Sequence, residues 1–304
     1  MTGILVTGAS SLPGFRIVCE ALKKGYDVIA LYWKNPIPIS NNNITKIRMD
    51  IRDLTSLKNL LHQNKPDIVI HAAALGDVDL CEKDKKLAWE TNVQSTISLA
   101  SLTAKLQAFL VYLSTDYVFD GEKGNYSEEE PPNPVDYYGF TKLMGEIACM
   151  SAGTEYAIVR ASSIYGFGPG RKNFAKFLVE KLSKNETVKA LVDQYTSPTQ
   201  ATLLGETVIE IVEKKLTGIF HVVGEKMSRY EFALKVAETL NLDKSLISPA
   251  KFEEMSWFAK RPRNSSLNFE KTKEKLKIDF YSTEKAFQTL KNEYISLVGG
   301  KQNL

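Results

Sequence analysis

The sequence predicts an α/β protein: a doubly wound parallel sheet with a smaller C-terminal lobe. Three observations lead to this prediction. Short apolar runs alternate with helical stretches through the first half of the chain, a pattern typical of a parallel sheet covered by helices on both faces. A glycine-rich turn joins the first apolar run to the first helical stretch, and the second half loses the regular alternation.

The first half contains the predicted sheet strands and the helices that connect them. The strands are expected at 3–8, 26–33, 44–51, 67–74, 108–115 and 156–166. The helices are expected at 12–25, 54–63, 85–106 and 137–150. Since crossovers between parallel strands are right-handed, the expected outcome is the Rossmann arrangement.

The second half begins with loops and contains one further predicted strand, at 218–225. A helix is expected to follow from 227 to 240, because Ser228 and Glu231 have the spacing of a capping box. We assign this irregular part to a lobe over the carboxyl edge of the sheet, with a ligand in the crevice between them.

Composition indicates the class of protein and the partners to expect. The 304 residues are 43% hydrophobic and 25% charged, a balance typical of a soluble globular protein. The net charge is only +3 and no long basic run occurs, so we expect neither nucleic acid nor a membrane as a partner. The three cysteines are odd in number and far apart, which favours reduced thiols in the cytoplasm.

The turn "VTGASSLPG" lies directly between the first strand and the first helix. Glycine in such a turn allows close approach of a pyrophosphate, which then lies on the helix N-terminus. Ser11 stands where a middle glycine is usual, and its hydroxyl could donate to a phosphate oxygen. A plain strand-to-helix turn is the alternative. The residues expected to bind the cofactor here are Gly8, Ser10, Ser11, Leu12 and Gly14.

The end of the second strand, "LYWKNP", bears on the choice of cofactor. An acid near this point usually binds the ribose 2′-hydroxyl of NAD, but none is present, while Lys34 and Arg16 are close in sequence. These cations favour the 2′-phosphate of NADPH, with NADH still possible; Lys34 could also be an ordinary solvated lysine. Asp50 and Ile51 follow the third strand and are expected near the adenine, although Asp50 could equally be a turn residue.

Tyr138 and Lys142 are four residues apart within the helical stretch 137–150. This spacing places a phenol and an ammonium on the same helix face. Tyr281 and Lys285 repeat the spacing, so spacing alone does not distinguish a proton-transfer site from two polar residues on a solvated face.

Six segments together carry a resemblance to a known family. They are "VTGASSLPG", "VIHAAALGDVDLCEKD", "YLSTDYVFDG", "PPNPVDYYGFTKLMGE", "VDQYTSPT" and "RPRNSSL". In this order they resemble the extended short-chain dehydrogenase/reductases over nearly the whole chain, and within them the dTDP-4-dehydrorhamnose reductase branch. The resemblance implies a dinucleotide-binding Rossmann domain at 1–160 and 196–224, and a substrate-binding lobe at 161–195 and 225–304.

The resemblance also implies the catalytic residues, which are Thr115, Tyr138 and Lys142, and makes the Tyr281–Lys285 pair a coincidence. A phenol has a pKa of about 10, and a neighbouring ammonium is expected to lower it. Tyr138 and Lys142 are expected to contact the cofactor too. The small residues Ala72, Ala73 and Ala74 are implied to pack against it. His71 is expected to serve packing or hydrogen bonding, and no metal site is predicted.

The residues after Thr115 indicate the type of reaction. The sequence continues with Asp116 and Tyr117, whereas dehydratases of the superfamily carry an acidic pair there. We therefore expect reduction of the 4-keto group of a nucleotide-linked deoxysugar, as in dTDP-L-rhamnose biosynthesis. The alternative is a regulatory role, because "GIFHVVGEKMSRYEFALKVAETLNL" and "RPRNSSL" equally resemble the regulatory β subunit of methionine adenosyltransferase.

The expected substrate contacts are Thr115, Asp116, Ser163, Asn173 and Arg261. Arg171, Lys172 and Arg263 are further candidates for a diphosphate, because an arginine fork suits phosphate oxygens. We also expect a homodimer through the helices at 85–106 and 137–150. Its candidate interface residues are Leu87, Val93, Ile97 and Leu102.

Overall fold

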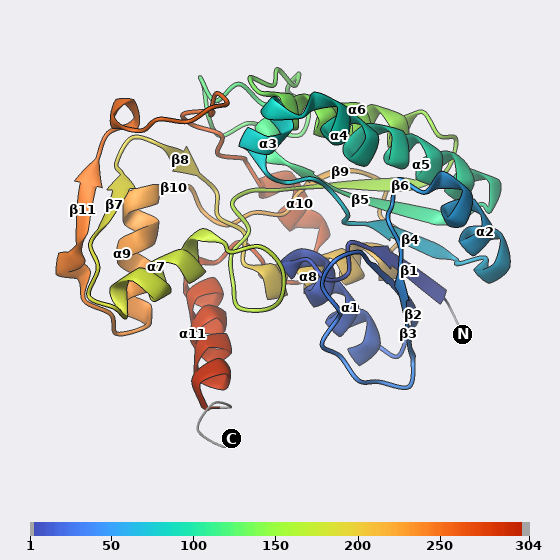
Figure 1. The fold of residues 1–304 in the computed structure, drawn as a ribbon, viewed down its shortest axis with the longest axis horizontal. Coiled ribbons are helices and arrows are strands. Elements are labelled where there is room, and N and C mark those ends of the chain that lie inside the picture. The colour runs from blue at the N-terminus through green and yellow to red at the C-terminus, as the bar shows by residue number, and fades with distance from the viewer. Residues whose placement is uncertain (1–2, 300–304) are drawn as a thin grey trace.

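The computed structural model describes residues 3–299 and contains the predicted parallel sheet (Figure 1). Within these residues its strand order is β3-β2-β1-β4-β5-β6-β9, and every neighbouring pair is parallel. The strands are β1 (Gly3–Thr7), β2 (Asp27–Tyr32), β3 (Ile44–Arg48), β4 (Ile68–His71), β5 (Phe109–Thr115), β6 (Tyr156–Ala161) and β9 (Gly218–His221). The order reverses between β1 and β4, which places a ligand crevice at the carboxyl ends of these two strands.

Helices cover both faces of this sheet, so the predicted doubly wound α/β fold is confirmed (Figure 1). On one face α1 (Leu12–Lys23) packs against α8 (Ala201–Glu213). On the other face lie α2 (Leu54–Asn64), α5 (Ser95–Lys105) and α6 (Tyr137–Met150).

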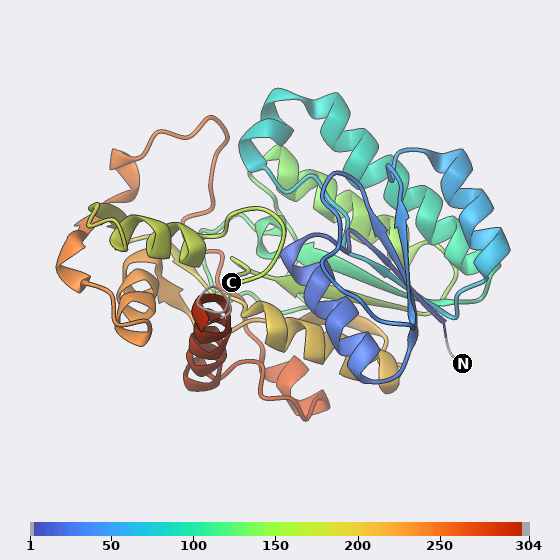
Figure 2. The same ribbon diagram turned by 60° about the horizontal axis from the view of Figure 1, so that its bottom comes forward.

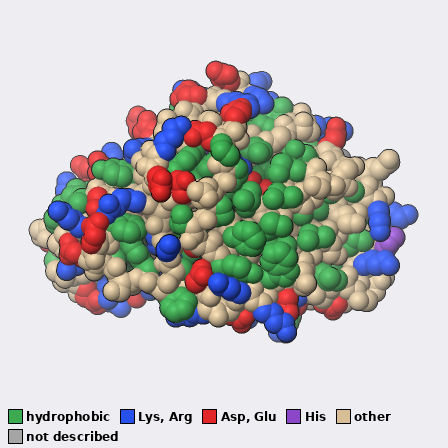
Figure 3. Space-filling model, turned by 90° about the horizontal axis from the view of Figure 1, so that it is seen from above, with side chains coloured by type: hydrophobic (Ala, Val, Ile, Leu, Met, Phe, Trp, Pro, Cys, Tyr) green, Lys and Arg blue, Asp and Glu red, His purple; other side chains and the backbone are tan. Residues whose placement is uncertain are grey.

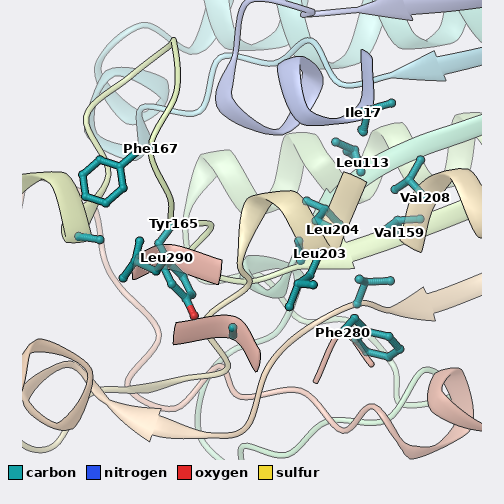
Figure 4. Close-up of a cluster of buried hydrophobic side chains, with 14 of the residues drawn as sticks. Ile17, Leu113, Val159, Tyr165, Phe167, Leu203, Leu204, Val208, Phe280 and Leu290 are labelled. Atoms are coloured by element: carbon teal, nitrogen blue, oxygen red, sulfur yellow. The ribbon is translucent and has the colours of Figure 1, made fainter. Parts of the chain in front are cut away.

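The central core fills the space between the sheet and α1 and α8 (Figure 4). Ile17 of α1 is fully buried there, together with Val159 of β6 and with Leu204 and Val208 of α8. Burying an aliphatic side chain of this kind contributes about 1.5–3 kcal/mol. The core therefore fixes the first helix, and with it the glycine-rich turn, to the sheet.

The predicted helix at 85–106 is in fact interrupted. It consists of α4 (Lys85–Trp89), one π-helical turn (Glu90–Gln94) and α5, and a further short helix, α3 (Val78–Lys83), precedes it. The π turn widens the helix by one residue per turn, an arrangement often found at functional sites. The sequence prediction merged the two helices because the apolar pattern continues through the interruption.

The second half forms a lobe beside the carboxyl edge of the sheet (Figures 1 and 2). Its helices and strands are α7 (Phe174–Leu182), β7 (Val188–Leu191), β8 (Tyr195–Thr196), β10 (Met227–Ser228), α9 (Arg229–Thr239) and β11 (Ile247–Ala250). β7 pairs with β11, and β8 with β10. The predicted capping box of Ser228 and Glu231 starts α9. Short 3-10 turns cover Asp116–Val118, Lys244–Leu246 and Phe252–Glu254.

The predicted strand at 156–166 ends at Ala161, and residues 166–173 form a loop that we call the strap. Ser163 breaks the strand because its φ is +42°, which is left-handed backbone. The last helices are α10 (Glu270–Lys275), which contacts β9, and α11 (Thr283–Gly299). No helix of residues 3–299 combines the length and the apolar character needed to cross a membrane.

Helix α11 joins the strap to the start of the chain through one carboxylate. Glu293 forms an ion pair of 2.9 Å with Arg16 of α1 and accepts a hydrogen bond of 2.7 Å from the Phe167 backbone N–H. It also accepts hydrogen bonds from the side chains of Gln200 and Thr202 at the start of α8. Arg16 is therefore occupied by α11 and does not reach the cofactor side, which corrects the expectation that it favours a 2′-phosphate.

Candidate active site

A cleft of about 470 Å³ opens at the carboxyl ends of β1, β2 and β4. It brings together most of the residues predicted to bind the cofactor, from four separate parts of the sequence. Those that line it are Gly8, Ser10, Ser11, Lys34, Asp50, Ile51, Ala72, Ala73 and Ala74. The cleft lies at the reversal of strand order, where doubly wound folds bind dinucleotides.

The glycine-rich turn has the geometry that a phosphate loop requires. Gly8 has φ +65°, and a Cβ there would lie 2.6 Å from the Ala73 backbone nitrogen. Gly14 instead lets α1 approach the turn, since a Cβ there would lie 2.3 Å from the Gly8 carbonyl oxygen. Gly14 and the buried Leu12 thus shape the turn without lining the cleft. Ser11 caps α1, and its hydroxyl donates to the Gly8 carbonyl. The expected donation from this hydroxyl to a phosphate oxygen is therefore not available in this structure.

The residues after β2 and β3 surround the far end of the cleft. Lys34 is exposed and lines the cleft, together with Trp33. Asp50 accepts a hydrogen bond of 2.6 Å from Arg52, and this bond lowers the pKa of the carboxyl group. Asp50 is thus both a turn residue and part of the cleft wall.

Thr115, Tyr138 and Lys142 lie at the carboxyl end of β5 and on the first two turns of α6. Thr115 ends β5 and is buried. Tyr138 is half-buried, and its ring meets the ring of Tyr117 edge-on at 5.9 Å. Lys142 is buried and donates a hydrogen bond of 2.6 Å to the Leu113 carbonyl. By contrast, Tyr281 precedes α11 and stacks on Phe269, on a different part of the molecule.

The environment of these groups changes their proton affinities. Burial lowers the pKa of Lys142 to about 8 and raises the pKa of the Tyr138 phenol; a hydrogen bond with Thr115 opposes the latter effect. The expected lowering of the Tyr138 pKa by Lys142 is not found. Desolvation dominates instead, and the Lys142 ammonium points to the Leu113 carbonyl and lies over the Tyr112 ring.

His71 is a structural residue, as we expected from its lone position. It is buried, and burial lowers its pKa to about 3, so the ring is neutral. The Ala73 N–H donates to Thr7 Oγ1, which lies 2.7 Å from His71 Nδ1. His71 Nε2 lies 2.9 Å from Thr96 Oγ1, which itself donates to the Asn92 carbonyl. This chain of hydrogen bonds fixes the cleft wall at Ala73.

Asn92 is a site residue that the sequence analysis missed. It lies on the π turn and is buried; its amide accepts from the Leu75 N–H at 2.7 Å and donates to Thr141 Oγ1 at 3.0 Å. It thereby joins the wall of the first cleft to α6, the helix of Tyr138 and Lys142. A lone asparagine within an apolar helical pattern gave no signal, because the π turn that directs it inward is invisible in the sequence.

A second cavity of about 440 Å³ is lined by residues of the strap and the lobe and by Tyr117, which follows β5. Its lining is cationic and aromatic. It includes Tyr117, Lys172, Asn173, Phe174, Gln194, Arg229, Trp257 and Arg261. Tyr117 connects this cavity to Tyr138, whose ring it contacts. Tyr138 thus contacts a residue of the cavity wall without lining the cavity itself.

Two predicted substrate residues, Arg261 and Asn173, line this cavity. Arg261 pairs with Asp79 of α3 at 2.9 Å, and the same carboxylate accepts the Ala259 N–H. Asn173 caps α7 and also donates to the Gly166 carbonyl. Arg229, which the sequence analysis missed, lines the cavity and forms no ion pair within residues 3–299.

The structure gives Asp116 a role different from the predicted substrate contact. Only 1% of the residue is exposed. Its carboxylate accepts hydrogen bonds from Thr115, Ser162 and Ser265, which lie at β5, after β6 and in the lobe. Asp116 therefore joins these segments behind the site. Ser163 is half-buried beside Ser162, in the strained conformation that ends β6.

The other two arginine candidates do not line this cavity. Arg263 is exposed and pairs with Asp193 and Glu253 at the outer side of the lobe. Arg171 lines the cofactor cleft. The strap thus separates the two cavities: Gly170 and Arg171 face the cofactor side, and Lys172 and Asn173 face the other.

Several known proteins are similar to this chain over most of its length. The probable low-salt glycan biosynthesis reductase Agl14 of Haloferax volcanii is 31% identical over 268 residues, which is 86% of this chain and 88% of that protein. Methionine adenosyltransferase 2 subunit beta of Bos taurus is 28% identical over 273 residues, covering 87% and 80% of the two chains.

Two solved structures share the fold over almost the whole chain. The hypothetical dTDP-4-dehydrorhamnose reductase of Sulfolobus tokodaii has a TM-score of 0.82 and 36% identity, covering 93% of this chain and 97% of that one. The dTDP-4-dehydrorhamnose reductase of Bacillus anthracis, in complex with NADP, has a TM-score of 0.85 and 27% identity, covering 97% and 100%. Residues 1–295 match the RmlD substrate binding domain. The chain therefore belongs to this RmlD-like family of extended short-chain dehydrogenase/reductases.

Proposed function

We propose that this protein uses NADPH to reduce the 4-keto group of a nucleotide-linked deoxysugar, as in dTDP-L-rhamnose biosynthesis. One observation carries the proposal: Thr115, Tyr138 and Lys142 lie together at the carboxyl end of β5, and Tyr138 contacts Tyr117, which lines the cationic cavity. Family relatives that act in glycan synthesis support it.

The cofactor proposed for the first cleft is NADPH. No acid follows β2 to bind a ribose 2′-hydroxyl, while the Lys34 ammonium is exposed beside the cleft. A related solved structure contains NADP. When bound, the dihydronicotinamide of NADPH supplies a hydride. NADH remains the alternative cofactor.

The chain itself would supply the proton and stabilise the charge. The Tyr138 phenol donates its proton to the oxygen of the ketone. The Thr115 hydroxyl, which donates to Asp116 in this structure, would turn to donate to that oxygen. Burial keeps the Tyr138 phenol protonated at neutral pH, which suits a proton donor. Lys142, whose ammonium donates to the Leu113 carbonyl, would hold the ribose of the nicotinamide, as the family resemblance implies.

The second cavity has the chemistry to bind a nucleotide diphosphate. The Arg229 and Arg261 guanidinium groups suit phosphate oxygens. Trp257 and Phe174 offer aromatic faces to a base or sugar ring. We therefore propose this cavity as the sugar-nucleotide site, with Arg229 added to the predicted Arg261 and Asn173.

The test is NADPH oxidation with dTDP-4-dehydrorhamnose as substrate. Tyr138→Phe should lower kcat by at least two orders of magnitude, since it removes the proton donor and keeps the ring. Tyr281→Phe is the matched control, because it makes the same change in the coincidental pair, and it should retain full activity. Equal kcat in Tyr138→Phe and the wild type would contradict the proposal.

A regulatory role is the second candidate, favoured by the similarity to the methionine adenosyltransferase subunit. The two functions differ in turnover. Binding of NADPH and sugar nucleotide without NADPH oxidation, together with co-purification of a methionine adenosyltransferase, would support the regulatory role.

A further inference from the structure

The strap, residues 166–173, lies beside the start of α1 (Figures 1 and 2), and its residues Gly170 and Arg171 line the cofactor cleft. Its backbone is in close contact with the phosphate loop. A Cβ on Gly170 would lie 2.9 Å from the Leu12 nitrogen and 3.1 Å from the Ser11 Cα. The Phe167 N–H on the same strap is held by Glu293. A segment that follows β6 thus covers the turn that follows β1.

Arg171 extends from this strap to the opposite lip of the cleft. Its guanidinium donates a hydrogen bond of 3.0 Å to the Gly76 carbonyl and pairs with Asp77 at 2.9 Å. Both residues follow β4, beyond the alanines that line the cleft. The guanidinium therefore spans the crevice between the β1 turn and the β4 turn.

The Arg171–Asp77 pair is weak and open to exchange. The side chain of Arg171 is 66% exposed and that of Asp77 is 39% exposed. Such pairs contribute little in water, whereas bidentate arginine–phosphate contacts are among the stronger hydrogen bonds. A phosphate in the cleft would thus compete well with the Asp77 carboxylate.

A cation at the phosphate end of the cleft would add to the backbone N–H groups that the turn offers a pyrophosphate. The cations that line the cleft among residues 3–299 are Lys34, Arg52 and Arg171. Lys34 follows β2, and Arg52 is held by Asp50 and Glu90 at the far end. Arg171 alone among these three comes from the strap, whose neighbour Gly170 touches the phosphate loop.

We propose that Arg171 is a cofactor-binding residue whose guanidinium leaves Asp77 and clamps the pyrophosphate when the dinucleotide binds. This inference rests on the proposed cofactor and is independent of the proposed sugar substrate. Asp77 then serves as the resting partner of Arg171 and competes with the ligand. The strap thereby makes the lobe sequence contribute to cofactor binding.

The neighbouring Lys172 provides a matched control. It lines the other cavity and pairs with Glu180 of the following helix α7. Arg171→Gln and Lys172→Gln therefore remove one positive charge each, one residue apart, from opposite sides of the strap.

The experiment measures the Kd of NADPH and of NADH by isothermal titration calorimetry on the full chain, without sugar nucleotide. Arg171→Gln should raise both Kd values about tenfold, because both cofactors carry the pyrophosphate. Lys172→Gln should leave both unchanged. Lys34→Gln should raise the Kd of NADPH alone, because only NADPH carries the 2′-phosphate.

The Asp77→Asn variant distinguishes competition from structural bracing by the direction in which the Kd values change. If Asp77 competes with the cofactor, its loss should lower both Kd values by a few fold or leave them unchanged. If the pair is instead a structural brace, Asp77→Asn should raise Kd as much as Arg171→Gln does, and the inference is overturned. Unchanged Kd values in Arg171→Gln also overturn it, while the proposed function stands. A wild type that binds neither cofactor defeats the proposed function itself.

Discussion

Asp136 lies two residues before Tyr138 and has a buried carboxylate whose two oxygens differ in their hydrogen bonding. Its Oδ1 caps α6 by accepting a hydrogen bond of 2.8 Å from the Gly139 N–H. Its Oδ2 is buried without a hydrogen-bond partner within residues 3–299. Burial raises the pKa of this carboxyl group from 3.8 to about 6. At neutral pH the fold therefore carries the cost of a poorly solvated charge.

Asp136→Asn should stabilise the protein, because asparagine caps a helix equally well and carries no charge. A carboxyl group whose folded-state pKa is raised destabilises the fold as pH rises from about 4 to about 6, so the gain should reach about 3 kcal/mol above that range. It should vanish near pH 4. Urea denaturation at several pH values measures the free energy of unfolding.

The control for this prediction is Asp53→Asn, which changes an exposed N-cap whose pKa is lowered by hydrogen bonds with Ser56. It should give no gain in stability. A gain for Asp136→Asn that is equally large at pH 4 and pH 7 would contradict the role assigned to its charge.

The sequence allowed individual residues to be assigned to the site where a family motif identified them. Thr115, Tyr138 and Lys142 were assigned by motif, and the structure brings them to one sheet edge. It could not assign Arg171 to the cofactor side, because which face of the strap a side chain points to depends on contacts 95 residues away, at Gly76.

Helix α6 is fixed to the sheet by a buried ion pair. The acidic partner lies on the helix face that also carries Tyr138 and Lys142. Glu146 lies two helical steps of four residues beyond Tyr138, and it accepts hydrogen bonds of 2.9 and 2.7 Å from Arg160 of β6. Both side chains are at most 2% exposed. Ser114, beside the catalytic Thr115, also donates to Glu146. The pair therefore positions α6 against β5 and β6.

Glu146→Gln should reduce the free energy of unfolding by about 3–5 kcal/mol, because it leaves the buried Arg160 charge unbalanced. The control is Glu213→Gln, which breaks an exposed pair with Lys24 and should cost under about 1 kcal/mol. Denaturant titration of both variants makes the comparison. Equal costs would show that the buried pair does not hold the helix.

Some elements were accessible to sequence patterns and others were not. The apolar runs predicted each strand of the main sheet, and the spacing of Ser228 and Glu231 predicted the start of α9. α3 was missed, because six residues with three polar side chains are too short to show an apolar period. Its acids nevertheless matter: Asp79 holds Arg261, and Glu82 accepts the Tyr137 N–H at the start of α6.

At the scale of the whole molecule, an apolar surface covers α5 and α6 (Figure 3). Ile97, Phe140, Ile147 and Met150 are each 39–49% exposed on these helices. Of the predicted interface residues only Ile97 belongs to this surface. Val93 and Leu102 are buried, and Leu87 lines the cofactor cleft.

We predict that two copies of the chain associate through this surface, since burying it would remove several large apolar side chains from water. Ile97→Glu combined with Ile147→Glu should convert a dimer into a monomer, as measured by light scattering after size-exclusion chromatography. Ile295→Glu is the control, because Ile295 is 57% exposed on α11 and belongs to neither helix of this surface. A wild type that is monomeric at all concentrations would refute the prediction.

The doubly wound fold followed from local patterns, because strand and helix periods are local properties. The two cavities could not be predicted from local patterns, because their walls depend on contacts between residues distant in the chain. One such contact is the ion pair of Arg261 with Asp79, 182 residues apart. No local signal encodes which distant carboxylate an arginine will meet.

Glu293 has a consequence for the synthesis of the protein. The first helix and the strap are both held by this carboxylate, which follows them by more than 100 residues. All strands of the main sheet precede residue 222, so they are synthesised before Glu293 is added. The nucleotide pocket is therefore fastened only after the sheet that carries it has been made.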